Sequence, residues 1–388
     1  MKTVYVGLSG GVDSSVSAAL LKQQGYKVVG VYMKNWSKDL PGLPCPWMDD
    51  YQDAKRVAVQ LYIDFKMYDF EKEYQHKVVD YMLDEFKAGR TPNPDIMCNQ
   101  EVKFKLFLNT ALDDGADFIA TGHYARVAKI ATRNSKIAAN RIPRYELRTA
   151  KDANKDQTYF LYRISQAALA KTIFPLGDLT KPQVRELAKK FKLVTADKKE
   201  SMGICFIGKV GIKEFLQQYV KTKPGKILDQ AGRQVGTHDG AIFYTIGQRH
   251  GLEVGGGLPY YVVGKDMKKN EVYVTTDLQD GKLWSREVCL ADMHWINGEP
   301  QISDGRSQIS VRLRHRAKLI DVKILNKPAP HQNLSAAVGN RIAEHQVFGA
   351  GSSETWVAEL EDEVRALTPG QSAVFYSGDV CLGGGIVI

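Results

Sequence analysis

The sequence lacks any apolar run long enough to cross a membrane, and its first residues resemble neither a secretory leader nor a transit segment. These absences predict a cytoplasmic protein without membrane association. Cysteine is also scarce: the five cysteines are an odd number, and no two have the CxxC spacing of a zinc site. We therefore expect no resident metal and no disulfide scaffold, but free thiols in a reducing compartment.

Acidic residues are outnumbered by basic ones. The chain has 53 Lys and Arg against 44 Asp and Glu, a formal net charge of +9. Such an excess favours a polyanionic partner, above all a nucleic acid. A basic surface that serves solubility explains the same count equally well, so charge alone leaves both interpretations open.

The 388 residues, 44% of them hydrophobic, predict two or three domains. Strand and helix patterns alternate in the first half, which predicts an α/β domain with a doubly wound parallel sheet over 1–209. Glycines cluster after about Lys209, and we expect a small α+β or β central domain over 210–286. Short alternating strands over 287–388 predict a β-barrel or sandwich. The basic stretch from Lys129 to Arg144 reads as an irregular exposed insertion.

A glycine- and serine-rich loop, LSGGVDSS at Leu8–Ser15, follows the apolar strand Thr3–Gly7. It is neither a Walker A motif nor GxGxxG. Backbone N–H groups in such a loop, together with the following helix N-terminus, bind phosphate. Asp13 suits this site only if Mg²⁺ accompanies the phosphate. An ordinary tight turn is the weaker alternative.

Two cysteines lie in informative surroundings. Cys98 precedes Asn99, which we expect to cap a helix whose dipole favours the thiolate. That dipole contributes only about 0.3–1 kcal/mol, so a cation such as Lys103 or protonated His123 would have to assist it. Cys205, between Ile204 and Phe206, reads alone as core filling, although nearby glycines favour an exposed turn. The other three cysteines read as structural.

Seven motifs together carry a resemblance. They are SGGVDSS, GRTPNPDIMCNQEVKF, TGHYARV, KDQTYFL, SMGICFIG, YTIGQRHGL and PGQSAVFYSGDVCLGGG. With them the chain closely resembles the bacterial tRNA-specific 2-thiouridylase family (MnmA type) of the ATP pyrophosphatase, or PP-loop, superfamily. The motifs span nearly the whole chain.

The resemblance implies ATP-dependent 2-thiolation of uridine 34 in tRNA. ATP, with Mg²⁺, would adenylate O2 of the uracil so that it leaves as AMP. Cys205 would carry sulfur as a persulfide, and Cys98 would release the product, which leaves a Cys98–Cys205 disulfide. The implied partners are tRNA, a sulfur donor protein (a cysteine desulfurase or a relay carrier) and a reductant. We expect a monomer.

The resemblance also assigns residues. Those that would line the ATP site are Gly7, Leu8, Ser9, Gly10, Gly11, Val12, Asp13, Ser14, Met33 and Gly122. Those that would contact the target base or the tRNA are Asn93, Pro94, Asp95, His123, Lys155, Asp156, Gln157, Arg314, His315 and Gln371. Asp95 is also the candidate for proton transfer. Without the resemblance, 155–157 would read as a surface turn.

Alternation predicts a basic strand whose Arg312, Arg314 and Arg316 share one face and track phosphates. The family usually has Arg-Tyr where this chain has Arg314-His315, so stacking by residue 315 is expected to be weaker or pH-dependent. Two rivals remain: another PP-loop tRNA-modifying or amidating ATP pyrophosphatase, and a tRNA-binding module with a relic nucleotide loop. A cysteine pair argues against the first, because amidation needs an amine nucleophile.

Overall fold

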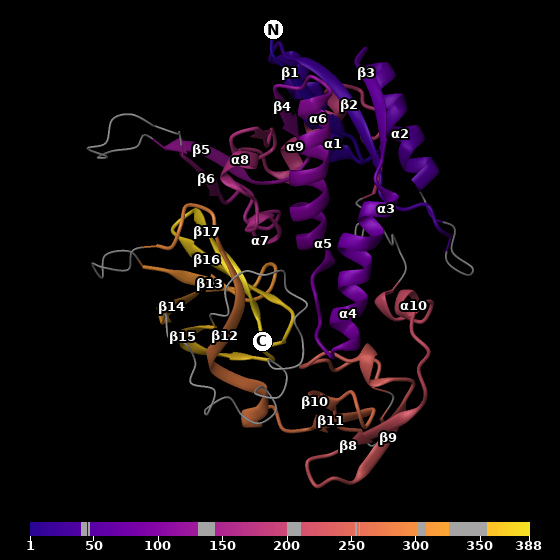
Figure 1. Ribbon diagram of the computed structural model, residues 1–388, viewed down its shortest axis with the longest axis vertical. Helices are drawn as coiled ribbons and strands as arrows, with labels where there is room; N and C mark the ends of the chain where they lie inside the picture. The colour runs from indigo at the N-terminus through magenta and orange to yellow at the C-terminus, as the bar shows by residue number, and fades with distance from the viewer. Residues whose placement is uncertain are drawn as a thin grey trace.

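The computed structural model describes residues 1–39, 45, 47–130, 144–199, 211–252, 254–255, 257–300, 308–325 and 355–388. Its described residues form three sheets, which Figure 1 shows as three parts of the molecule. The segment 200–210, with the predicted sulfur carrier Cys205, lies outside the described residues.

The first sheet has five parallel strands in the order β3-β2-β1-β4-β7. Its strands are β1 (Thr3–Gly7), β2 (Lys27–Lys34), β3 (Asp64–Asp69), β4 (Phe118–Ala120) and β7 (Thr172–Ile173). The helical segments of this half are α1 (Val12–Gln23), α2 (Trp47–Gln60), α3 (Glu71–Tyr74), η1 (Gln75–Asp80), α4 (Tyr81–Lys87), α5 (Pro94–Met97), η2 (Cys98–Phe107), α6 (Leu108–Asp113), α7 (Thr158–Leu161), α8 (Gln166–Leu169), α9 (Lys181–Lys190) and α10 (Ile212–Leu216).

Helices cover both faces of this sheet. Val4 and Val6 of β1 point to one face and pack with α1 and α2, while α9 packs beside α1. Tyr5 points to the other face, where the core runs through the segments from Tyr74 to Ala111. Successive side chains of a strand point to opposite faces, so one apolar strand serves both cores. The predicted doubly wound α/β fold is confirmed.

A hairpin leaves this half and joins another sheet. Strands β5 (Arg126–Ile130) and β6 (Arg144–Arg148) pair antiparallel, and β6 pairs with β17 (Val380–Val387) near the chain's end. The expected irregular insertion therefore begins and ends in strands. The alternation of side chains along 126–130 indicates a strand, but the basic composition of the stretch was read as an exposed loop. Residues 131–143 lie outside the described residues.

The central sheet has four strands in the order β10-β11-β8-β9. Its elements are β8 (Gly225–Leu228), β9 (Gln234–His238), the 3₁₀ turn η3 (Ala241–Phe243), β10 (Tyr261–Asp266) and β11 (Glu271–Thr275). Its core is small and separate from the others. The 3₁₀ turn η4 (Gly281–Leu283) leads out of it to the last sheet.

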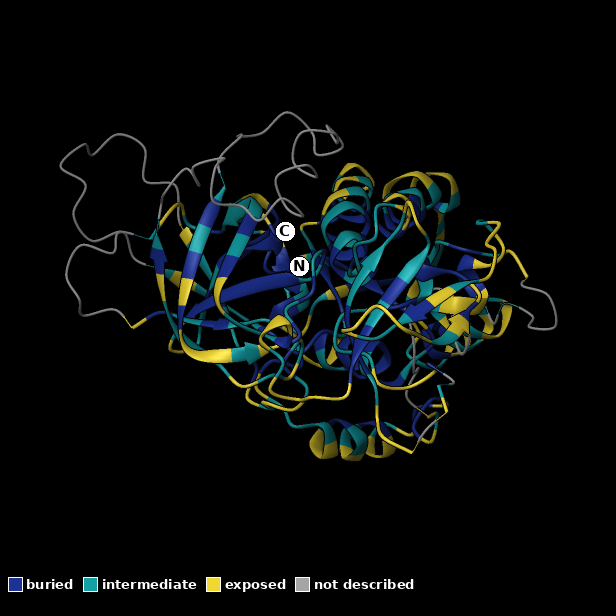
Figure 2. Cartoon of the chain, turned by 90° about the horizontal axis from the view of Figure 1, so that it is seen from below, coloured by how far each residue is buried: buried dark blue, intermediate teal, exposed yellow. Residues whose placement is uncertain are grey.

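The last sheet closes into a six-stranded antiparallel barrel. The strand order is β12-β15-β14-β13-β16-β17, and β12 pairs back to β17. Its other strands are β12 (Trp284–Trp295), β13 (Ser310–Arg312), β14 (Ile320–Leu325), β15 (Trp356–Arg365) and β16 (Ser372–Ser377). Figure 2 shows buried residues alternating with less buried ones along these strands. Closure removes free sheet edges and confirms the predicted barrel.

Candidate functional site

The loop after β1 forms a cradle at the N-terminus of α1. The hydroxyls of Ser9 and Ser14 lie 3.2 Å apart, and the backbone N–H of Ser9 donates to Ser14 Oγ at 3.2 Å. Gly10 has φ +72°, and a Cβ there would lie 2.4 Å from the carbonyl oxygen of Asp50. Only glycine fits this left-handed position. A glycine-permitted turn that opens a 12-residue helix is the arrangement that binds phosphate.

Neighbouring strands supply the walls of the cradle. A Cβ on Gly122, just past β4, would lie 2.7 Å from the backbone nitrogen of Ser14. A Cβ on Gly7 would lie 3.0 Å from Cε of Met33 on β2. The structure therefore brings Gly7, Met33, Gly122 and the loop together at the carboxyl ends of three adjacent strands, as predicted from the sequence.

Asp13 has partners that the sequence did not suggest. Nζ of Lys181, the first residue of α9, lies 2.7 and 2.8 Å from the two carboxylate oxygens. The hydroxyl of Tyr124 donates to the same carboxylate at 2.9 Å. Thr180 forms a capping box at this helix start and Pro182 follows in the first turn, but nothing local in the sequence connects Lys181 to a residue 168 positions earlier.

The donor set at Asp13 fits Mg²⁺ only in company with phosphates. Among the described residues no group of three or more His, Cys, Asp or Glu gathers to hold a metal. One carboxylate and nearby serine hydroxyls suit a Mg²⁺ that takes its other ligands from phosphates and water.

Cys98 lies inside a helix, not before one. Segments α5, η2 and α6 run without interruption from Pro94 to Asp113. Asn93 is the cap, and its side chain accepts from the N–H of Asp95 at 3.2 Å. The predicted cap at Asn99 is wrong, because Asn93-Pro94 supplies both a capping side chain and a proline at the first helical position.

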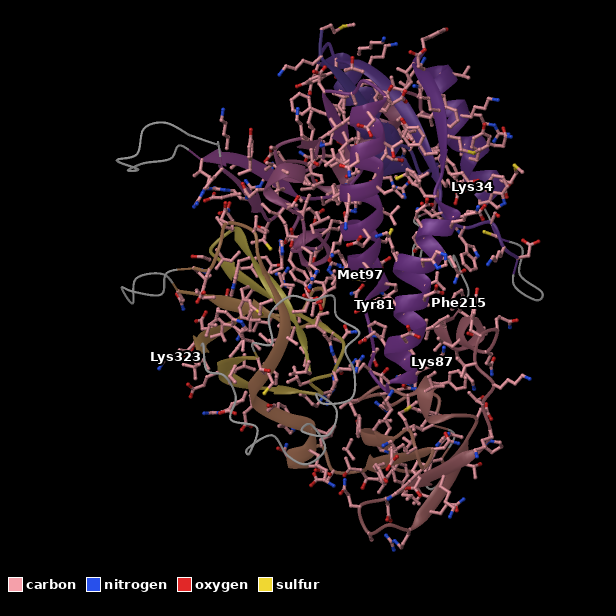
Figure 3. The ribbon with its side chains drawn as sticks, viewed as in Figure 1. Lys34, Tyr81, Lys87, Met97, Phe215 and Lys323 are labelled. Carbon is pink, nitrogen blue, oxygen red and sulfur yellow. The ribbon has the colours of Figure 1, made fainter. Side chains whose placement is uncertain are left out.

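Cys98 lies in the apolar core that packs around this helix. The cysteine is 2% exposed, and Asn99 donates from Nδ2 to the carbonyl oxygen of Phe160 at 3.0 Å. Met97, labelled in Figure 3, precedes it near the lower end of the long helix that leads up to the parallel sheet. Asp95 and Cys98 are three residues apart, so they share one side of the helix.

The same helix reaches the phosphate cradle. Phe107 lies 3.7 Å from where a Cβ of Gly7 would stand. Phe104 packs on His123 with ring centroids 5.7 Å apart. Since His123 follows Gly122, the helix that carries Cys98 and the loop that carries Asp13 line one region at the sheet edge.

His123 does not supply a positive charge near neutral pH. Burial lowers its pKa well below the ordinary value, and the charge of Lys103 lowers it further. The ring is 8% exposed, and Nδ1 lies 2.8 Å from the hydroxyl of Thr121. The expectation that a protonated His123 assists the Cys98 thiolate is therefore wrong. A contact with tRNA stays a prediction and requires greater exposure of this side chain.

The segment 155–157 joins parts of the molecule. Asp156 is 2% exposed and forms an ion pair with Arg312 at 3.2 Å. Gln157 accepts from the N–H of Tyr124 at 2.9 Å, which connects it through Tyr124 to Asp13. Lys155 is half-buried. The surface-turn alternative is wrong for Asp156, since its carboxylate lies between the first half of the chain and the barrel.

The predicted basic strand ends early. Strand β13 stops at Arg312, and Arg316 has φ +64° in the turn that follows. Arg314 donates to the carbonyl oxygen of Ala366 at 2.5 Å, and Arg316 donates to that of Asn154 at 3.0 Å. The three arginines therefore do not form one face of a strand, because the chain turns where alternation would have had to continue.

His315 is half-buried and packs against an aromatic ring of the protein. Its ring lies 4.6 Å, centroid to centroid, from that of Phe160. Burial and the charges of Arg316, Arg312 and Lys155 lower the pKa of His315 to about 4. The ring is neutral at physiological pH, so the expected pH-dependent stacking does not apply near neutrality.

Gln371 also meets protein. Its Nε2 donates to the carbonyl oxygen of Thr91 at 2.7 Å. Thr91 belongs to the connection that leads into the Cys98 helix. This contact spans 280 residues of sequence and was not foreseen.

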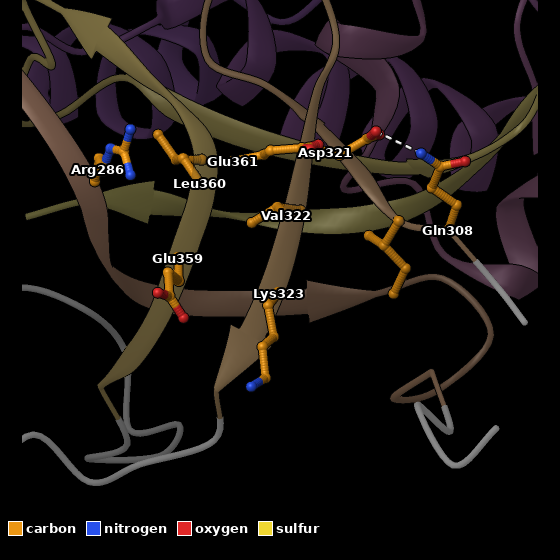
Figure 4. Close-up of a pocket in the computed structure, with 9 residues that line it drawn as sticks. Arg286, Gln308, Asp321, Val322, Lys323, Glu359, Leu360 and Glu361 are labelled. Carbon is orange, nitrogen blue, oxygen red and sulfur yellow. Dashed lines mark hydrogen bonds between the residues drawn. The ribbon is translucent and has the colours of Figure 1, made fainter. Parts of the chain in front are cut away.

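One hollow on the surface lies on the barrel, away from the phosphate cradle. It has a volume of about 430 Å³ and is drawn in Figure 4. Its walls include Asp321, Glu359 and Glu361 beside Arg286 and Lys323. Acidic side chains repel phosphates, so this hollow suits neither a nucleotide nor an RNA backbone.

In the described part of the chain, no helix has the length and apolarity needed to span a bilayer.

Comparison with known families matches three stretches of the chain. Residues 2–209 match the family described as tRNA methyl transferase HUP domain. Residues 213–276 match its PRC-barrel domain, and residues 346–387 match an aminomethyltransferase beta-barrel domain.

Two curated relatives match over nearly the full length. A tRNA-specific 2-thiouridylase MnmA from Bacillus thuringiensis (strain Al Hakam) is 44% identical over 386 residues, 99% of this chain and 94% of the relative. That of Oceanobacillus iheyensis is 45% identical over 385 residues, with the same coverage of both chains. Among solved structures, NMN synthetase from Francisella tularensis covers 52% of this chain and 66% of its own, at 18% identity and a TM-score of 0.33.

Proposed function

The chain belongs to the family of tRNA-specific 2-thiouridylases, and we propose that it replaces O2 of uridine 34 in tRNA with sulfur at the expense of ATP. It is then a tRNA-uridine 2-sulfurtransferase. The observation that carries this proposal is the match of 44–45% identity across 99% of the chain. The adjacency of the phosphate cradle and the Cys98 helix supports it.

The first half-reaction uses the cradle. The residues around Ser9, Asp13 and Gly122 hold the phosphates of ATP, with Mg²⁺ neutralising their charge when bound. O2 of the uracil attacks the α-phosphorus, the bond to the bridging oxygen breaks, and pyrophosphate leaves. The adenylated oxygen is then a good leaving group. Asn93, Pro94 and Asp95 hold the base, beside the start of the Cys98 helix.

The second half-reaction uses the two thiols. The terminal sulfur of a Cys205 persulfide attacks C2, and the C2–O2 bond breaks to release AMP. Cys98, as thiolate, then attacks the Cys205 sulfur, and the thiolated base departs with its electron pair. Asp95, one turn from Cys98, accepts the thiol proton. A Cys98–Cys205 disulfide remains, so a thiol reductant must restore both thiols.

The other assignments complete the proposal. The tRNA is contacted by Lys155, Gln157, Arg314 and residues of the barrel. The three domains comprise residues 1–209, 210–286 and 287–388. His123 and Asp156 lie beside these tRNA-contacting residues and belong to the same proposed surface. The enzyme works as a monomer in the cytoplasm, where tRNA, ATP, thiol reductants and a sulfur donor protein occur together.

The test is mass spectrometry of tRNA nucleosides after incubation of the full chain with ATP, Mg²⁺, a thiol reductant and a donor of sulfane sulfur, namely a cysteine desulfurase with cysteine. The expected product is a uridine at position 34 heavier by the difference between sulfur and oxygen, formed only with ATP. Cys205→Ser should abolish it, and Cys289→Ser is the matched control. A methylated base, which the description of the HUP family would suggest, or product formation by Cys205→Ser would contradict the proposal.

A further inference from the structure

The connection between α4 and the Cys98 helix is held from two sides. At Thr91, the backbone N–H donates to the carbonyl oxygen of Pro369 at 2.8 Å, and the carbonyl accepts from Gln371 Nε2 at 2.7 Å. The hydroxyl of Thr91 lies 3.1 Å from that of Thr245. Pro369 and Gln371 come from the barrel region and Thr245 from the central region. We call these four residues the Thr91 junction.

The barrel side of the junction is backbone against backbone. Gly370 has φ +92°, and a Cβ there would lie 2.8 Å from the nitrogen of Thr91 and 2.9 Å from its carbonyl carbon. No side chain can separate the two segments. On either side of Gly370, the carbonyl of Pro369 accepts from the Thr91 N–H and the side chain of Gln371 donates to the Thr91 carbonyl. These two hydrogen bonds fix the position of Thr91.

The connection itself has little freedom. Arg90 forms an ion pair with Glu85 of α4, and Glu85 is 1% exposed. The Nε of Arg90 lies 2.6 Å from the Glu85 carboxylate. A Cβ on Gly89 would lie 2.8 Å from Cγ of Met267 in the central region. Lys87, at the lower end of α4 in Figure 3, marks where this connection starts. Two residues after Thr91, Asn93 caps the helix that carries Asp95 and Cys98.

The central side of the junction adjoins another part of the proposed chemistry. Thr245 lines a hollow of about 360 Å³ together with Gly211, Ile212 and Lys213. Gly211 follows residue 210, the end of the segment that contains Cys205. Thr91 thus lies between the start of the Cys98 helix and the elements that follow the sulfur-carrier segment.

We propose that Thr91 is a positioning residue: the barrel, through Gln371, and the central region, through Thr245, set the placement of the base-holding loop and of Cys98. The inference rests on the proposed function and deepens it. Gln371 then acts on the reaction through the Thr91 carbonyl. Docking of both accessory regions becomes a condition for productive alignment of the target base.

The test compares single-turnover thiolation at saturating tRNA with the Kd for tRNA, in the full chain. Gln371→Met removes the donor at nearly constant volume, and misplacement of about 1 Å can slow a reaction by up to about a hundredfold. We expect a rate at least about tenfold lower with an unchanged Kd for tRNA. Gln60→Met is the matched control, since Gln60 also donates to a backbone carbonyl, that of Lys192, far from the junction.

The threonine pair gives an independent test. Thr91→Val and Thr245→Val each leave one hydroxyl without its partner, whereas the double variant leaves two apolar groups of the same shape, which is often nearly neutral. The single variants should slow thiolation, while Thr91→Ser and the double variant should recover most of the rate. Recovery in the double variant is not expected if either hydroxyl contacts RNA or substrate.

The outcomes separate the two proposals. If the wild-type chain does not thiolate tRNA, the proposed function is wrong. If it does, and Gln371→Met raises the Kd for tRNA while the saturated rate is normal, Gln371 is an RNA ligand and the positioning role is wrong. Normal rates in Thr91→Val and Thr245→Val would also overturn it, whatever the folding of the Gln371 variant.

Discussion

The negative charge of Asp13 is balanced by Lys181, whose ammonium contacts both carboxylate oxygens. The lysine side chain is 13% exposed and lies beside the phosphate cradle. A Walker A loop carries its lysine within the motif, and this loop has none. Lys181 places a cation there from another part of the chain. Without it, a phosphate would approach an unbalanced carboxylate.

Lys181→Met should therefore weaken the use of ATP. Hydrogen bonds to charged groups contribute about 1.5–3 kcal/mol, so kcat/KM for ATP should fall about tenfold or more. Lys181→Arg should retain part of the activity because it keeps the charge. Initial rates of pyrophosphate release at varied ATP measure this. An unchanged kcat/KM in Lys181→Met would show that the ion pair serves only the fold.

At His315 the prediction concerns pH. The folded protein holds the pKa near 4, below the unfolded value of about 6.5, so the unfolded chain binds the extra proton first. Stability should therefore fall as the pH drops from 6.5 towards 4. His315→Phe keeps a ring against Phe160 but cannot titrate. Urea unfolding at pH 7 and pH 5 should show a smaller loss for this variant, and equal losses would contradict the assignment.

Elements far apart in the sequence meet at buried polar contacts. Strand β13 ends in Arg312, whose ion pair with Asp156 ties the barrel to the first half of the chain. The hairpin of β5 and β6 does the same through β17. Thr158 also donates to Asp156, at 2.7 Å. Charged groups buried this deeply are costly unless paired, so these contacts hold the barrel in one orientation.

Arg312→Met should destabilise the protein strongly. Removing one member of a buried pair typically costs about 3–5 kcal/mol, because the other charge is left without compensation. Adding Asp156→Asn should recover part of the loss. Lys318→Met is the control, since Lys318 and Asp362 form an exposed pair at 3.8 Å. The urea midpoint measures all three, and equal midpoints for Arg312→Met and Lys318→Met would contradict the role of this contact.

At the scale of the whole molecule, local patterns were enough for much of the fold. The β1 strand and the phosphate loop follow from short-range apolar spacing and glycine chemistry. Asn99 was mistaken for a cap because two asparagines precede apolar residues, and only the proline after Asn93 distinguishes them. The arginines after β13 were placed on a strand because alternation continues in sequence past the point where the chain turns.

Contacts between distant residues could not be predicted in the same way. Lys181 and Asp13 are 168 positions apart, and Gln371 and Thr91 are 280 apart. Neither pair leaves a spacing signal: the first depends on the packing of α9 beside α1, and the second on the docking of the barrel against the first half. The burial of Asp156 beside Arg312 is likewise a result of that docking, whereas His123 is covered by Phe104 and Phe174 of the first half. The residues that we propose to do chemistry were thus named from motifs, while the distant partners that contact them were not.

The central claim is that adenylation of a tRNA base drives the entry of sulfur. The most direct measurement is the ratio of AMP formed to 2-thiouridine formed, with the wild-type chain, tRNA in excess, ATP, Mg²⁺, a thiol reductant, and a cysteine desulfurase with cysteine as the source of sulfane sulfur. The account predicts equal amounts of AMP, pyrophosphate and thiolated uridine 34, and no AMP without tRNA. Thiolated tRNA without a matching amount of AMP, or AMP formed at the same rate without tRNA, would contradict it.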